Sequence, residues 1–122
     1  MKYCARCGVE LILGIESGRE RPMCPGCGFI VYRNPVPVAL VLATREDKLL
    51  LVHRLNPPLA DYWTPSTGYV EIDESLEEGA RREVKEETGC DVVIDKLLNV
   101  YSRANMGVML VTFAARVVGG DL

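Results

Sequence analysis

Charged residues are concentrated in the stretch from Gly68 to Cys90, which reads GYVEIDESLEEGARREVKEETGC. Within it Glu83, Glu86 and Glu87 are spaced i, i+3 and i+4, which brings side chains together on one face of a helix. Like charges at this spacing repel one another by a few tenths of a kcal/mol per pair. A hard divalent cation prefers oxygen ligands and removes that repulsion. The spacing therefore predicts a metal site carried by a helix.

The same stretch contains helix boundaries. Asp73 is a suitable N-cap and Gly89 a suitable C′ glycine, so residues 74–88 are expected to be helical. At about 100° per residue, the three glutamates border the apolar face and the other charged residues lie opposite. That outer set comprises Glu77, Glu78, Arg81, Arg82 and Lys85. A surface helix held by ion pairs such as Glu78–Arg82 is the alternative, but it leaves three acids beside the core unexplained.

The spacing of these residues resembles the Nudix box: glycine, five residues, Glu, seven residues, then Arg-Glu, an aliphatic, any residue, Glu-Glu, any residue, glycine and an aliphatic. Cys90 in the last place is the departure from it. The resemblance implies hydrolysis of a nucleoside diphosphate linked to another moiety. It also implies roles for particular residues. Magnesium or manganese would be held by Glu83, Glu86 and Glu87, Arg82 would orient these carboxylates, Glu74 would support them, and Gly68 and Arg54 would meet the substrate.

Two possibilities exist for the catalytic base. Many relatives use a glutamate well after the box, whereas no glutamate follows Glu87 in this chain. Either a residue of the box serves as the base or the base is missing.

Four cysteines form a second pattern, Cys4-x-x-Cys7 and Cys24-x-x-Cys27. This spacing is typical of a zinc site, and a segment of about thirty residues needs such a site because it cannot bury a sufficient core. Two disulfides are the alternative, but the chain opens MKYCARCG without an apolar signal segment. We therefore expect a zinc ribbon over residues 1–34 and a reducing, cytoplasmic location.

Charge argues against nucleic acid as a partner of the ribbon. Residues 1–34 hold five Lys/Arg and three Asp/Glu, a balance of +2, and four zinc-bound thiolates with their ion contribute −2. The longest apolar runs are too short to cross a membrane. A small-molecule nucleotide is the expected partner.

The remaining pattern predicts an α+β fold in residues 35–122, with a mixed sheet and the box helix on one face. Residues 38–44 and 48–54 are expected to form a hairpin, and residues 92–101 and 108–118 to form long strands. Nudix folds place a second helix on the other face of the sheet, and here it would fall beyond the end of the chain. The uncovered face predicts a homodimer, or a natural protein that continues past Leu122.

Two classes of substrate are to be compared. A cysteine ribbon before the box resembles the NADH pyrophosphatase branch, but residues 100–106, VYSRANM, lack the signature of that branch. They are closer to ADP-ribose pyrophosphatases, so ADP-ribose is expected ahead of NADH. A non-catalytic module that senses a nucleotide is the competing interpretation, and the retained box glutamates favour an enzyme.

Overall fold

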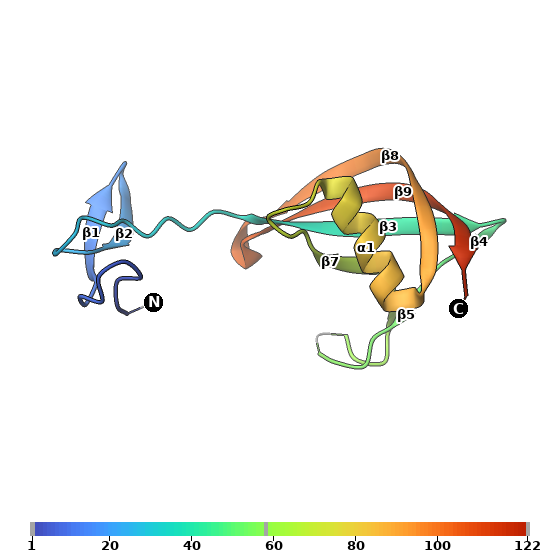
Figure 1. Ribbon diagram of the computed structural model, residues 1–122, viewed down its shortest axis with the longest axis horizontal. Coiled ribbons are helices and arrows are strands. Elements are labelled where there is room, and N and C mark those ends of the chain that lie inside the picture. The colour runs from blue at the N-terminus through green and yellow to red at the C-terminus, as the bar shows by residue number, and fades with distance from the viewer. Residues whose placement is uncertain (1, 58, 122) are drawn as a thin grey trace. The chain divides into compact units, whose positions relative to one another are not determined.

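The computed structural model describes residues 2–57 and 59–121, which form two compact units divided between Asn34 and Pro35 (Figure 1). Within these residues no helix is long and apolar enough to cross a membrane. Each unit has its own organisation and carries one of the two candidate metal sites.

The first unit is a β-hairpin, with β1 at Ile12–Glu16 and β2 at Arg19–Met23, held between two cysteine loops. The hairpin turn consists of Ser17 and Gly18, both at positive φ (51° and 77°), as the tightest hairpin turns require. Cys4 and Cys24 are buried, whereas Leu13 and Ile15 are 66% and 70% exposed. The described part of this unit therefore has buried sulfur atoms in place of an apolar core.

The second unit is built on a five-stranded mixed sheet in the order β4-β3-β9-β8, with β7 also paired to β3. Its strands are β3 (Val36–Arg45), β4 (Lys48–Leu49), β7 (Ser66–Tyr69), β8 (Cys90–Arg103) and β9 (Val108–Gly120). The central pair β3 and β9 is parallel, and the other pairs are antiparallel. A short 3₁₀ helix, η1 (Ala104–Met106), connects β8 to β9, and β5 (Val52–His53) pairs with β6 (Trp63–Thr64) in a separate ribbon.

The expected long strands correspond to β8 and β9, but the expected hairpin is only partly formed. The turn after Arg45 is present, while the second strand divides into the short β4 and β5. Strand β7 has no counterpart among the strands expected from the sequence. Its residues Ser-Thr-Gly-Tyr lack an apolar alternation, and the strand exists because its backbone pairs with β3.

Helix α1 (Leu76–Thr88) packs on one face of the sheet (Figure 1). Ala80 and Val84 on the helix are fully buried against a cluster that includes Val41 and Phe113. The helix ends at Gly89 as expected, at φ 78°. The expected N-cap Asp73 is wrong, because Ser75 caps the helix and Glu78 completes a capping box, which satisfies two backbone N–H groups.

The other face of the sheet is less covered. Leu40 and Leu42 on β3, and Leu110 and Ala114 on β9, alternate with the residues under α1 and are only partly buried. Within the described residues α1 is the one α-helix.

Candidate active site and zinc centre

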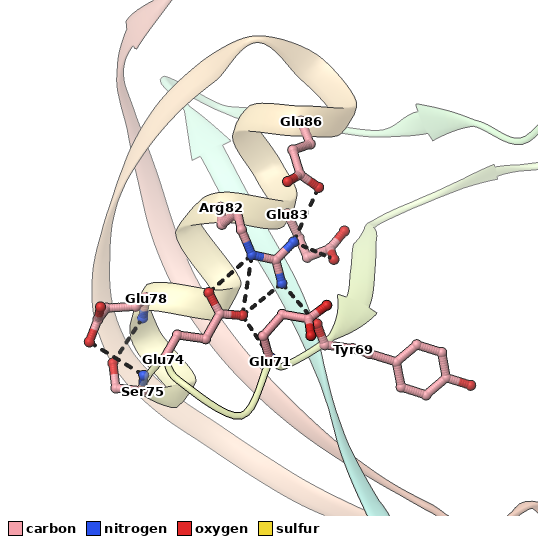
Figure 2. Close-up of polar contacts among 8 residues, drawn as sticks. All are labelled: Tyr69, Glu71, Glu74, Ser75, Glu78, Arg82, Glu83 and Glu86. Atoms are coloured by element: carbon pink, nitrogen blue, oxygen red, sulfur yellow. Dashed lines mark hydrogen bonds and ion pairs between the residues drawn. The ribbon is translucent and has the colours of Figure 1, made fainter.

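Arg82 lies at the centre of the candidate active site (Figure 2). Its Nε and Nη2 groups donate to the carboxylate of Glu74 at 3.0 and 2.7 Å, and Nη2 also donates to the backbone oxygen of Tyr69 at 2.9 Å. Its Nη1 group donates to Glu83 at 3.0 Å and to Glu86 at 3.1 Å. All five guanidinium N–H groups thus have acceptors, which fixes the side chain in one orientation.

The position of Arg82 corrects the helical-wheel prediction. The wheel predicts that Arg82 lies on the outer, solvated face with Glu78 as its ion-pair partner, yet its side chain is 29% exposed and faces Glu74. Glu78 instead accepts from the backbone of Ser75 in the capping box. Glu74 lies before the helix, in the preceding loop, so a wheel that treats residues 74–88 as helical does not give its position.

Glu74 is held as a carboxylate. Hydrogen bonds from Arg82, and a further one of 2.8 Å from the backbone N–H of Glu71, lower the pKa of Glu74 to about 2. Gly79 leaves the necessary space, since a Cβ atom there would lie 2.9 Å from a Glu74 oxygen. Glu74 is therefore charged at neutral pH.

Gly68 on β7 gives Glu83 its position. A Cβ atom on Gly68 would overlap the carboxyl group of Glu83, which no other residue type could accommodate without displacing that side chain. The glycine therefore lets the carboxylate lie directly over the strand. This is the structural reason for a glycine at the first place of the box.

Glu87 is paired with Glu83. Partial burial and its hydrogen bond with Glu83 raise the pKa of Glu87 to about 7, whereas the Ser66 hydroxyl and the Arg54 guanidinium lower it. Repulsion between two ionised carboxylates opposes loss of the Glu87 proton. Arg54, predicted to meet the substrate, is thus near enough to act on Glu87.

The three glutamates are not gathered around one point. Glu83 and Glu86 are turned to the guanidinium of Arg82, and Glu86 is 59% exposed. In the described parts of the chain, the one group of three or more potential ligands that converges is formed by Cys4, Cys7, Cys24 and Cys27.

The four cysteine sulfur atoms lie within 4.8 Å of one another, with Sγ–Sγ distances of 3.6 Å for Cys4–Cys27 and 3.4 Å for Cys7–Cys24. All are free thiols, so the disulfide alternative is wrong. Sulfur atoms about 3.8 Å apart are what tetrahedral zinc requires, given Zn–S bonds of about 2.3 Å. Backbone N–H groups point at the sulfur atoms, from Arg6 to Cys4 and from Cys27 to Cys24. The geometry and the soft donor set fit a closed structural zinc site.

Comparison with known proteins agrees with this geometry. The NUDIX domain family matches residues 33–121, and the zinc-ribbon family described as Nudix N-terminal matches residues 2–33. The chain belongs to the Nudix family. Nudix proteins of this kind combine a divalent-metal site in the domain with zinc in the ribbon, and the two match ranges meet at residue 33.

Similar Nudix proteins include one from Stutzerimonas stutzeri named NAD-capped RNA hydrolase NudC, 31% identical over 99% of this chain and 43% of its own length. An ADP-ribose pyrophosphatase from Methanocaldococcus jannaschii is 33% identical over 75% of this chain and 57% of its own length. A crystal structure of a Nudix hydrolase from Nitrosomonas europaea superposes with a TM-score of 0.94 at 36% identity, covering 99% of this chain and 70% of that one. The chain thus spans about half the length of these two named relatives.

Two participants in the Nudix site carried no sequence signal. The backbone oxygen of Tyr69 accepts from Arg82, and any residue type could supply it. Ser66, buried next to Glu87, lies in β7, which the pattern did not predict.

Proposed function

We propose that the Nudix unit hydrolyses the diphosphate of a nucleoside diphosphate linked to another moiety, with ADP-ribose as the first candidate substrate. The observation that supports this most is the contact between the carboxyls of Glu87 and Glu83, the latter lying directly over Gly68. Two acids held this close repel each other when ionised, which is unfavourable in a helix that needs only to pack. A cation would remove that cost.

Magnesium or manganese fits the donor set, because both prefer carboxylate oxygens. Glu83, Glu86 and Glu87 would hold it, and when bound the cation would lower the pKa of water and neutralise diphosphate charge. The hydrogen bonds from Arg82 to Glu83 and Glu86 support their assignment as oriented ligands. Arg82 and Glu74 would act by holding those carboxylates in place.

The reaction is an attack by water on phosphorus. The new P–O bond forms as the bridging P–O bond breaks, giving a nucleoside monophosphate and a phosphorylated second product. Arg54 would attract the diphosphate, because its charge already acts on Glu87. A carboxylate of the box is the proposed acceptor of the water proton, with Glu87 as the first candidate.

An NAD-type dinucleotide is the second candidate. The match to the NAD-capped RNA hydrolase covers 99% of this chain, ribbon included, whereas the match to the ADP-ribose pyrophosphatase covers 75%. The extent of the first match therefore favours an NAD-like substrate, free or at an RNA end.

A substrate panel with magnesium tests both candidates: ADP-ribose, NADH, NAD and NAD-capped RNA, with release of nucleoside monophosphate or decapped RNA as the measured product. Preferred turnover of ADP-ribose supports the first proposal, and preferred turnover of a nicotinamide substrate replaces it with the second. No turnover of any of them, with zinc and fold intact, contradicts the enzymatic proposal.

We also propose that the chain self-associates through the sheet face opposite α1, where Leu40, Leu42 and Leu110 are only partly buried. Light scattering should give twice the mass of the 13.5 kDa chain, and a stable monomer would contradict it.

The free thiols at the zinc ligands support a reducing compartment such as the cytoplasm.

A further inference from the structure

Strand β7 and helix α1 place two pairs of residues opposite each other. Ser66 and Gly68 are two apart on the strand, so they share a face and lie about 7 Å apart. Glu83 and Glu87 are four apart on the helix, about 6 Å along its axis. Gly68 lies directly under Glu83, since a Cβ atom on the glycine would overlap that carboxyl group. The matching spacings bring Ser66 under Glu87.

The Ser66 hydroxyl makes no hydrogen bond that would stabilise the fold in the described residues. Ser66 is 2% exposed, and its Oγ has no hydrogen-bond partner of acceptable geometry. Its backbone pairs with Val41 on β3, so an alanine would serve the strand equally well. A buried hydroxyl without a partner is destabilising and calls for an explanation.

The hydroxyl nevertheless lies next to the Glu87 carboxyl, to which it can donate a hydrogen bond. A hydroxyl is a donor that strengthens its bond when the acceptor becomes ionised. A divalent cation at Glu87 favours the same ionised form. The two effects are therefore cooperative, and each makes the other more favourable.

We propose that Ser66 is a positioning residue whose hydroxyl donates a hydrogen bond to the Glu87 carboxylate when a divalent cation is bound. The hydrogen bond holds one oxygen of Glu87 against the strand and leaves the other for the metal, as groups behind metal ligands commonly do. This inference rests on the proposed function, since it requires a cation at Glu87.

The test is Mn²⁺ binding to the full chain without substrate, measured by calorimetry. Ser66→Ala should bind Mn²⁺ about 10-fold more weakly, the lower end of the range for loss of such a group. Without metal its melting temperature should equal or exceed that of the unaltered chain, because an unpaired buried hydroxyl is removed. Addition of Mn²⁺ should then raise the melting temperature of Ser66→Ala by less than it raises that of the unaltered chain.

Two further variants serve as controls. Ser66→Thr keeps the hydroxyl and should bind Mn²⁺ more tightly than Ser66→Ala. Thr112→Val removes another buried hydroxyl, from the face of β9 that points away from α1, and should leave the affinity unchanged.

Equal Mn²⁺ affinity in Ser66→Ala and the unaltered chain overturns this inference alone. Absence of Mn²⁺ binding by the unaltered chain overturns the proposed function and this inference with it.

Discussion

The two candidate metal sites differ in how far the chain must fold before they exist. In the ribbon, each Cys-x-x-Cys pair is contained in one tight loop, and the four sulfur atoms converge within 4.8 Å. In the Nudix unit, Glu83 is placed by Gly68 from another element, and Arg82 is held by Glu74 from before the helix. Zinc at the first site can stabilise the fold of the ribbon unit. The second site, in contrast, forms only once the Nudix unit has folded.

The largest expected effect comes from removing zinc. Cys24→Ser should abolish zinc binding and unfold the hairpin of residues 12–23, because the buried residues of this unit are Cys4 and Cys24 and zinc supplies folding free energy on the order of 10 kcal/mol. Elemental analysis and amide exchange measure this, and the Nudix unit should remain protected. Cys90→Ala, at a buried cysteine outside the cluster, should keep one zinc per chain. A protected hairpin in Cys24→Ser would contradict the comparison.

An intermediate effect is expected at the glutamate site. Glu87→Gln should lower kcat by about 10²-fold or more, as for loss of other preorganised charges, while the fold persists. In the absence of divalent cations at pH 8 it should be more stable than the unaltered chain by a few tenths of a kcal/mol. The raised pKa, about 7 against an ordinary 4.5, means that the contribution of Glu87 to stability is present below 4.5 and lost as pH rises through 7.

Urea titration at pH 5 and 8 measures that difference in stability, and steady-state assays measure kcat. Unchanged kcat in both Glu87→Gln and Glu86→Gln would exclude these residues from catalysis.

The smallest effect concerns Glu74. Its pKa of about 2 lies below the ordinary 4.5, so the ionised form stabilises the fold above pH 4.5, and this contribution is lost as pH falls toward 2. Glu74→Gln should therefore be less stable than the unaltered chain at pH 7, with a gap that narrows by pH 3. Urea midpoints at pH 7, 4 and 3 give the gap. A gap that stays constant with pH would show that the Glu74 charge is not the source of the stability.

Much of this protein is predictable from residues that are close in sequence. The cysteine spacing predicts free thiols at a zinc site, and the box spacing predicts a helix ending at Gly89 with Ala80 and Val84 on its apolar face. The helix start is also encoded locally, since Ser75 and Glu78 form a capping box, although Asp73 is an equally suitable cap by residue type. Such features depend on chemistry within one loop or one helical turn, which a linear sequence displays.

The tertiary structure alone decided which groups the glutamates contact. The position of Arg82 among Glu74, Glu83 and the Tyr69 carbonyl depends on a loop folding back and on β7 pairing with β3. The helix must also lie on that strand for Ser66 to be buried beside Glu83 and Glu87, whose carboxyls are in contact. These contacts join residues on separate elements, so their distances and burial arise only when the sheet and helix pack, and no spacing in the sequence encodes them.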